Sequence, residues 1–304
     1  MLPTYTRCQR TLFRNSIRKY HTLTQHLVLF GSLVCLYYLY FPGGLSLDLM
    51  KPVLSMNAAI ENQVNKSTIG KSKTITISTT ITTNMSATEL KFKSTCSMAA
   101  DHRGFHQNVI GYSIYGDFSD SNFYGQYLSV FSETLRTIPI RYPGWVVRIY
   151  HNITMENVES WTILNNILDL GHHIDLCNAT QIIKNRELSD IFAMTWRWLP
   201  LLDDMVDSFM SRDTDSLIIH REVDAVHEWL ASNTTFHIMR DHPYHDWFFI
   251  GCCWGVKIHQ ERSAIVAAAK KMFYENHLHQ YNYDQTLLIR YYQSIAVKSM
   301  VCIK

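Results

Sequence analysis

Hydrophobic and polar positions follow two alternating periods from residue 96 onward. Short apolar runs, typical of buried strands, are separated by stretches with apolar residues every three or four positions, typical of amphipathic helices. Strands are predicted at 108–117, 144–152, 173–178 and 206–210, and a further short strand is predicted just before Arg240. Helices are predicted at 122–138, 155–171, 221–232 and 263–277. This alternation predicts βαβ units and an α/β fold with a mostly parallel sheet flanked by helices on both faces.

The helix predicted at 155–171 illustrates the helical spacing. Its apolar residues recur on one face, and Gly171 follows as a stop signal. We expect that face to pack against the sheet; it consists of Val158, Trp161, Leu164, Ile167 and Leu168.

The N-terminal region predicts a membrane anchor. An apolar run extends from Leu27 to Phe41 and continues more weakly to Leu47, with no Asp or Glu before Asp48. A helix needs roughly 20 apolar residues to span a bilayer, and the run to Leu47 reaches that length. Five basic residues precede it and should stay cytosolic, which places the C-terminal bulk in the lumen; they are Arg7, Arg10, Arg14, Arg18 and Lys19.

We therefore predict a basic cytosolic tail at 1–25 and a transmembrane anchor at 26–47, the layout of a single-pass type II membrane protein. The alternative is a cleaved signal peptide, which the bulky residues at the end of the run and the lack of a small-x-small cleavage site disfavour. Residues 48–95 are rich in Ser and Thr and predict a stalk, with an edge strand as the alternative. Residues 96–304 then form the lumenal domain.

Composition and cysteine content fit a lumenal globular domain. Apolar residues make up 47% and charged residues 18% of the 304 residues, which argues against global disorder. The net charge of +2 gives no reason to expect a nucleic-acid partner. Some of the five cysteines after the anchor should pair in an oxidising lumen, and their odd number leaves at least one without an intramolecular partner. Possible N-glycosylation sequons occur at Asn65, Asn84, Asn152, Asn178 and Asn233.

The candidate chemistry centres on Asp213 and Asp215. These residues follow the strand predicted at 206–210, and ligands of parallel α/β sheets bind at the carboxyl ends of strands. Two carboxylates spaced in this way can share a hard cation, Mn²⁺ or Mg²⁺, with phosphate oxygens of a substrate completing the coordination. The alternative interpretation is a solvated acidic turn.

Four segments in order, "WRWLPLLDDMVDSFMSRDTDS", "EVDAVHEWLAS", "FHIMRDHPYHDWFFIGCCWGVK" and "YNYDQTLL", resemble a glycosyltransferase family with the GT-A fold. Its members include polysaccharide-associated bacterial proteins and uncharacterised eukaryotic ones. The resemblance covers about residues 110 to 295. It implies a GT-A-like (Rossmann-like) fold, a nucleotide-sugar donor, an acceptor cleft over the sheet and a divalent metal at Asp213 and Asp215. It also implies that Asp215 contacts the metal directly, with Asp213 nearer the ribose and a metal-bound water.

Several further residues are candidates for binding the nucleotide sugar. Arg197 suits a diphosphate, with a surface ion pair as the alternative. Arg212 directly precedes Asp213 and joins this group. Arg240 follows a probable strand and is a candidate for sugar contact. Trp254 could stack on a sugar ring, and core packing is its alternative role.

Catalytic candidates come from two other segments. Asp241 or His242 is a candidate general base, and an ion pair between Arg240 and Asp241 is the alternative. Asp284 stands at a probable helix start and is either an acceptor-side catalytic carboxylate, as the resemblance implies, or a helix cap.

The leading hypothesis is a metal-dependent glycosyltransferase of the Golgi or ER membrane that moves a sugar from a nucleotide-sugar donor to a glycan or glycoconjugate acceptor. A non-catalytic carbohydrate-binding Golgi or surface protein of the same fold is the alternative. It is favoured by the lack of a histidine near the C-terminus, where relatives often supply a further metal ligand. A metal-dependent phosphohydrolase ranks third, because in such enzymes the acidic motif normally lies near the start of the domain.

Overall fold

The computed structural model describes residues 93–116, 118, 127–240 and 247–303. None of the helices within these ranges combines the length and the apolar character needed to cross a membrane. The anchor predicted at 26–47 and the stalk before residue 93 lie outside the described residues.

Strands and helices alternate through most of the chain, as the sequence pattern predicts. The first half contains α2 (Met98–His102), β1 (Gln107–Ile114), α4 (Phe131–Arg141), β2 (Trp145–His151), α5 (Val158–Leu168), β3 (Ile174–Asn178) and α6 (Ala179–Asn185). The second half contains the 3-10 helix η3 (Ala193–Leu202), β4 (Val206–Ser211), α7 (His220–Ala231), β5 (Phe236–Met239), β6 (Trp254–Lys257), η4 (Ile258–Gln260), α8 (Arg262–Phe273), α9 (Tyr283–Ala296) and β7 (Met300–Ile303).

The strands form one seven-stranded sheet in the order β3-β2-β1-β4-β6-β5-β7. Strands β1, β2, β3 and β4 pair in parallel, as do β5 and β7, whereas β6 runs antiparallel to both of its neighbours. The expectation of an α/β fold with a mostly parallel sheet is therefore confirmed. Strands β6 and β7 are not among the strands predicted from the sequence.

The strand order places a topological switch point between β1 and β4. From β1 the chain moves outward through β2 to β3, and then returns to the other side of β1 to form β4. Open α/β sheets bind ligands in the crevice that forms where the connections diverge in this way, beyond the carboxyl ends of the strands. The topology alone therefore directs attention to the ends of β1 and β4.

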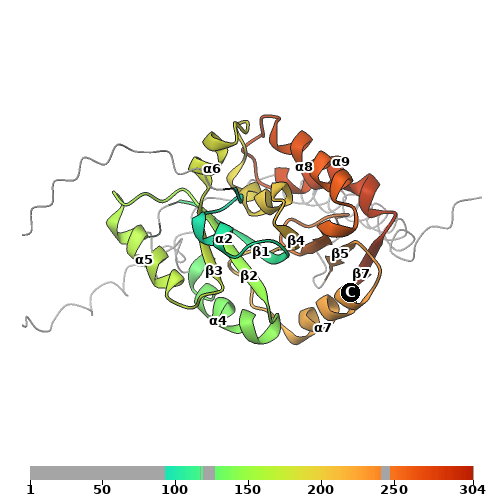
Figure 1. Ribbon diagram of the computed structural model, residues 1–304, viewed down its shortest axis with the longest axis horizontal. Helices are drawn as coiled ribbons and strands as arrows, with labels where there is room; N and C mark the ends of the chain where they lie inside the picture. The colour runs from blue at the N-terminus through green and yellow to red at the C-terminus, as the bar shows by residue number, and fades with distance from the viewer. Residues whose placement is uncertain (1–92, 117, 119–126, 241–246, 304) are drawn as a thin grey trace, which may run out of the picture. The chain divides into compact units, whose positions relative to one another are not determined.

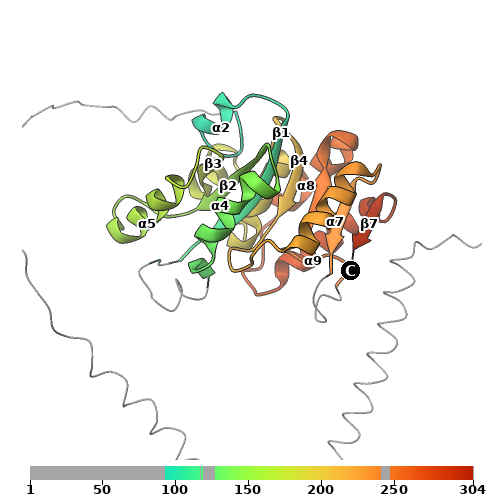
Figure 2. The same cartoon turned by 90° about the horizontal axis from the view of Figure 1, so that it is seen from below.

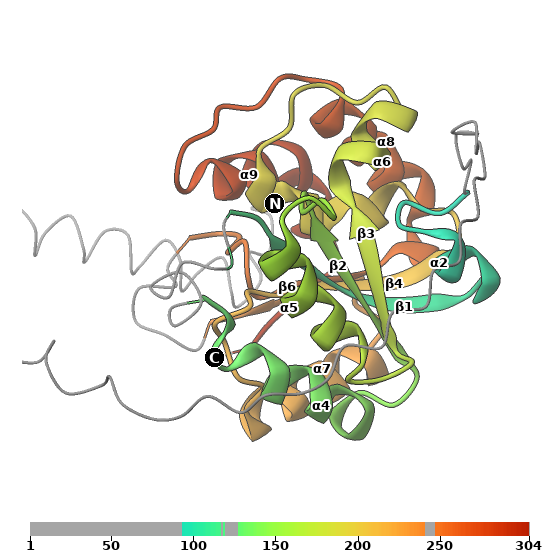
Figure 3. The same ribbon diagram turned by 90° about the vertical axis from the view of Figure 1, so that its left-hand side faces the viewer.

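Helices cover the sheet on both faces and bury a separate apolar core on each side. One core lies between the sheet and helices α6, η3, α8 and α9, and the other between the sheet and α4, α5 and α7. Figures 1 and 3 show α6, α8 and α9 above the strands and α4 and α7 below them. Figure 2 shows α4 and α7 lying next to each other across the second face.

Helix α5 is shorter than its apolar pattern predicts. It begins after Asn157, whose side chain caps the helix by accepting a hydrogen bond from the backbone N–H of Ser160. Leu164 and Ile167 are buried, but Val158 is 71% exposed and Leu168 is 40% exposed, so the prediction that these two residues pack against the sheet is wrong. Val158 and Leu168 are the first and last residues of the helix, and the buried residues lie between them.

Polar side chains also set the ends of other helices. Asn178 ends β3 and caps α6, because its side chain accepts a hydrogen bond from the backbone N–H of Gln181. Among the sequon residues that the structure describes, Asn152 and Asn233 are exposed. The buried Lys257 caps the C-terminal end of α7. Its ammonium group donates hydrogen bonds to the carbonyls of Trp229, Leu230 and Ser232, where the last helix carbonyls have no helical partner.

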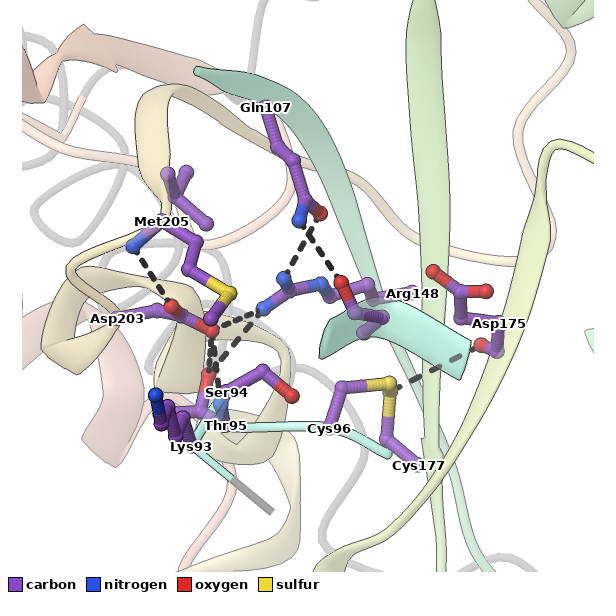
Figure 4. Close-up of polar contacts among 12 residues, drawn as sticks. Lys93, Ser94, Thr95, Cys96, Gln107, Arg148, Asp175, Cys177, Asp203 and Met205 are labelled. Atoms are coloured by element: carbon purple, nitrogen blue, oxygen red, sulfur yellow. Dashed lines mark hydrogen bonds and ion pairs between the residues drawn. A yellow bond between two sulfur atoms is a disulfide. The ribbon is translucent and has the colours of Figure 1, made fainter. Parts of the chain in front are cut away.

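A buried ion pair holds the first described segment against the domain, at the end of the sheet opposite the switch point (Figure 4). Arg148 of β2 is fully buried, and its Nη1 lies 2.6 Å from Oδ2 of Asp203. The same carboxylate accepts a hydrogen bond from the backbone N–H of Thr95 at 2.7 Å. Gln107, the first residue of β1, accepts a hydrogen bond from Nη2 of Arg148. The guanidinium of Arg148 and the carboxylate of Asp203 thus connect the segment at Thr95, strands β1 and β2, and the loop before β4.

A disulfide reinforces this attachment. Cys96 is bonded to Cys177 of β3, and both are buried. Arg103, just after α2, forms an ion pair with Asp175 of the same strand at 2.9 Å. The described residues begin at residue 93, three positions before the domain boundary that was expected from the sequence.

Candidate active site

The Asp-x-Asp motif lies directly after β4, at the switch point of the sheet. The backbone N–H of Arg212 still donates a hydrogen bond to the carbonyl of Gly111 in β1, so the chain leaves the sheet only after this residue. Asp213 and Asp215 both line two cavities, of about 510 Å³ and about 470 Å³, and Asp213 also lines a third of about 340 Å³. The two carboxylates therefore face common space, as the sequence predicts.

Arg197 joins two of the predicted site residues. Its guanidinium forms ion pairs with Asp213 through Nη1 and with Asp284 through Nη2, the latter at 3.1 Å. Arg197 is only 4% exposed, so its side chain is buried, unlike the surface ion pair considered from the sequence; its pair with Asp284 is buried, whereas the side chain of Asp213 is 37% exposed. Burial lowers the pKa of this guanidinium, but Asp213 and Asp284 outweigh that effect and raise it.

Two glycines make room for Arg197. A Cβ at Gly111 would overlap the backbone carbonyl of Arg197, and a Cβ at Gly251 would lie 2.7 Å from its Nη2 and closer still to Oδ2 of Asp284. The backbone N–H of Arg197 donates a hydrogen bond to Oγ of Ser113 at 2.8 Å. The arginine is thus fixed from β1 on one side and from the turn before β6 on the other.

The site contains more acidic than basic groups, and the carboxylates of Asp215 and Asp284 have raised pKa values. Burial, and next the neighbouring charge of Asp213, raise the pKa of Asp215. Burial also raises the pKa of Asp284, against the opposing effect of Arg197. The second oxygen of Asp284, Oδ1, is buried and has no hydrogen-bond partner among the described residues. Each carboxylate would be stabilised by a cation or a hydrogen-bond donor brought in by a ligand.

The cavity of about 470 Å³ opens at the end of β1. Ser113, Ile114 and Tyr115 line it together with Asp213 and Asp215. Tyr127 and Tyr281 complete an aromatic rim that the sequence analysis missed. The end of the strand predicted at 108–117 could have indicated Tyr115, whereas Tyr281 is brought in from a distant part of the chain. Aromatic rings beside carboxylates suit a ligand with a flat base or sugar and a charged part.

The cavity of about 510 Å³ lies on the other side of the motif, over β4, β5 and β6. Arg212 and Glu222 form an ion pair in its wall. His237, which is 3% exposed, stacks on the ring of Trp229, and its Nδ1 has no hydrogen-bond partner among the described residues. Burial lowers the pKa of His237 to about 4, so this imidazole is neutral near pH 7. Sequence analysis identified Arg212, but neither His237 nor the pairing with Glu222.

Trp254 serves in core packing, the alternative that the sequence left open, rather than in sugar stacking. It is 1% exposed and packs against Trp198, Phe209 and Phe249 with ring centroids 5.4 to 6.2 Å apart. The physical reason is that Trp254 begins β6, a strand in the middle of the sheet, which turns its ring into the core.

Arg240 follows β5 and donates a hydrogen bond to the carbonyl of Phe248 at 2.8 Å. It is not among the residues that line the three cavities described above. The catalytic candidates Asp241 and His242 lie outside the described residues, and with them the ion pair considered between Arg240 and Asp241.

Asp284 lies in the first turn of α9, as the predicted helix start implies. It is not the capping residue, because Asn282 holds that position in a left-handed conformation. The carboxylate of Asp284 turns instead to Arg197 and to the cavity of about 340 Å³. The structure thus unites Arg197, Asp213, Asp215 and Asp284, four of the residues predicted from the sequence.

The residues present suit a hard cation with few protein ligands. No group of three or more His, Cys, Asp or Glu side chains within the described ranges is arranged to hold a metal ion. Asp213 and Asp215 alone would supply carboxylate oxygens, and water and substrate phosphates would supply the others, as magnesium-type ions often require. Burial, and next the charge of Asp213, raise the pKa of Asp215, and a bound cation would favour the ionised carboxylate against both effects.

Comparison with models of protein families and with curated proteins finds no match for this chain. Any assignment of function therefore depends on the chemistry and the position of the site.

Proposed function

We propose that the protein is a metal-dependent glycosyltransferase that uses a nucleotide-diphosphate sugar as donor and a glycan or glycoconjugate as acceptor. The observation that carries the proposal is the position of Asp213 and Asp215. They follow the central strand β4 at the switch point of a mostly parallel sheet and line the cavities there. A sheet of this kind suits a nucleotide, and the strand order is compatible with the GT-A-like architecture that the sequence resembles.

Asp213 and Asp215 would hold Mn²⁺ or Mg²⁺ together with the donor diphosphate. When bound, such a cation neutralises the negative charge that develops on the leaving diphosphate. Arg197 takes a different part from the diphosphate contact expected from the sequence, because both of its Nη atoms are already engaged by Asp213 and Asp284. Its role in the proposal is to position the donor-side carboxylate relative to Asp284.

Asp284 is the described residue best placed to act on the acceptor. Its Oδ1 is buried and has no hydrogen-bond partner in the part of the chain that the structure describes, its pKa is raised by burial, and it lines a cavity that Asp213 also lines. An oxygen in that state can accept a hydrogen bond, and then a proton, from an acceptor hydroxyl. Asp284 is thus proposed as the general base, with the Arg197 ion pair fixing its other oxygen.

The proposed location is the Golgi or ER membrane, with the domain in the lumen and the helix predicted at 26–47 as anchor. The disulfide between Cys96 and Cys177 supports an oxidising compartment. The exposed side chains of Asn152 and Asn233 are compatible with glycosylation there.

The test is a screen of nucleotide sugars with the full-length chain and Mn²⁺. We expect at least one donor to release free sugar slowly through hydrolysis, and Asp215→Ala to abolish the release. Nucleotide binding without any release from any donor, with or without added glycans, would instead favour the carbohydrate-binding alternative. Absence of both binding and release would contradict the proposed function.

A further inference from the structure

A disulfide between adjacent residues forms part of the wall of the candidate active site. Cys252 and Cys253 are joined to each other and lie in the turn just before β6. Both line the cavity of about 510 Å³ together with Asp213 and Asp215, and Cys252 also lines the cavity of about 340 Å³. The sequence analysis expected some cysteines to pair but did not predict a bond between these two.

The turn that carries this disulfide contacts the site from several sides. The carbonyl of Gly251 accepts a hydrogen bond from Oγ of Ser211, at the end of β4, at 2.6 Å. The carbonyl of Cys253 accepts one from the N–H of Met239, at the end of β5, at 2.9 Å. A Cβ at Gly251 would clash with Oδ2 of Asp284 and Nη2 of Arg197, so the turn lies directly against this pair. A change in the turn therefore reaches the residues that hold Asp213.

The two disulfides of the described chain differ in accessibility. Cys96 and Cys177 are buried, with at most 1% of their surface exposed. Cys252 and Cys253 are partly exposed and face a cavity. Thiol–disulfide exchange needs direct approach of a thiolate to a sulfur atom, so a small reductant should reach the second pair while the fold is intact.

We propose that Cys252–Cys253 is a thiol–disulfide exchange site whose oxidation state sets the affinity of the cleft for its ligand. In the reaction, one thiolate of a dithiol attacks a sulfur of the pair and breaks the S–S bond. The second thiolate of the dithiol then attacks the dithiol's own sulfur in the resulting mixed disulfide and breaks its bond to the protein. The products are two cysteine thiols and one cyclic disulfide. The dithiol supplies both electrons and both protons. The free thiols rotate independently, the turn loses its constraint, and the contact between Gly251 and the Arg197–Asp284 pair loosens.

The first part of the test concerns the site alone. The full-length chain is treated with increasing dithiothreitol under native conditions, thiols are trapped with iodoacetamide, and peptides are analysed by mass spectrometry. We expect Cys252 and Cys253 to be alkylated at lower dithiothreitol concentrations than Cys96 and Cys177. Equal or reversed order overturns the assignment of the exchange site.

The second part concerns ligand affinity and rests on the proposed function. Calorimetric titration with Mn²⁺ and a panel of nucleoside diphosphates should show about fivefold weaker binding to the selectively reduced chain, with recovery after reoxidation. The double variant Cys252→Ser/Cys253→Ser should bind as the reduced chain does and ignore dithiothreitol. Equal affinity of the oxidised and reduced chains overturns the coupling. If no nucleotide binds in either state, the proposed function and the coupling both fail, whereas the order of alkylation still decides whether the exchange site exists.

Discussion

At the scale of single residues, the Asp215 carboxylate shows most directly why a cation would bind at this site. Burial and the charge of Asp213 raise its pKa above the ordinary value of 3.8. Both effects disfavour the ionised form, and a bound cation would reverse them. A proton and a metal ion therefore compete for the same oxygens.

This competition predicts how metal binding depends on pH. Because only the ionised carboxylate holds the cation, affinity for Mn²⁺ should fall as the pH is lowered through the raised pKa of Asp215, with a midpoint above 3.8. Electron paramagnetic resonance titrations between pH 7 and 4 measure it, with circular dichroism as a check on the fold. In Asp213→Asn the midpoint should move downward, since the neighbouring charge is gone. Affinity that stays constant down to pH 4 contradicts this assignment.

Local sequence was enough to predict some of these residues but not their partners. Asp213 and Asp215 could be identified because they directly follow a recognisable strand. The role of Arg197 could not, because its partner Asp284 is 87 positions away and meets it only in the folded sheet. The role of Trp254 was left open between sugar stacking and core packing, because a strand of four residues preceded by a glycine and two cysteines resembles a loop in sequence.

At the scale of elements, the site depends on how closely β1 and the turn before β6 approach Arg197. The two approaches differ in what a new methyl group would meet. At Gly251 it meets the ends of two side chains, and at Gly111 it meets the backbone carbonyl of Arg197 and the ring of Phe209. Side-chain ends can shift more readily than backbone within a packed sheet.

Gly251→Ala should therefore impair binding more than folding. We expect it to displace the Arg197–Asp284 pair and to weaken Mn²⁺-dependent nucleotide binding about tenfold, or 1.4 kcal/mol, while stability falls by about 1–3 kcal/mol. Gly111→Ala is the matched comparison and should lose more stability, because the backbone itself must move. Calorimetry and urea unfolding measure the two effects. Unchanged binding by a folded Gly251→Ala chain argues against the positioning role of the turn.

The order of elements was easier to predict than their pairing. Alternating strand and helix patterns indicated β1, β2, β3 and β4 because each strand is a short segment with several apolar residues that lies between helical patterns or turns. The antiparallel strand β6 and the final β7 were missed, whereas β5, which also has four residues, was predicted. Both strands pair with β5 in the sheet. The pattern of apolar residues within a strand does not indicate which other strand it pairs with.

At the scale of the whole molecule, the end of the sheet opposite the site is held by the Arg148–Asp203 ion pair and the segment that begins at residue 93 (Figure 4). A buried charge that loses its partner keeps its desolvation cost without compensation. Mutations in this network therefore test whether the segment before β1 is an integral part of the domain.

Arg148→Met should lower the free energy of unfolding by about 3–5 kcal/mol, because it leaves the carboxylate of Asp203 buried without its cation. In an Asp203→Asn background the same change should cost less, with a coupling of about 1–3 kcal/mol between the two sites. Urea denaturation of the four chains in this cycle measures the coupling. Strictly additive losses would show that the two side chains stabilise the fold independently.

The class of the fold could be predicted at this scale, but the strand order could not. Alternating patterns establish α/β, whereas the positions of β1 and β4 as neighbours depend on how each crossover packs on the sheet. The anchor at 26–47 and the stalk remain predictions from composition, because they lie outside the described residues.

The most direct test of the central claim is calorimetric titration of the full-length chain with Mn²⁺ and nucleoside diphosphates. Asp215→Asn removes one carboxylate of the proposed metal site, and Asp204→Asn removes an exposed carboxylate just before β4, at the opposite end of the same strand. The account predicts metal-dependent binding by the unaltered chain and by Asp204→Asn, and a loss of at least about tenfold in Asp215→Asn, or 1.4 kcal/mol. Equal binding by all three chains would contradict it.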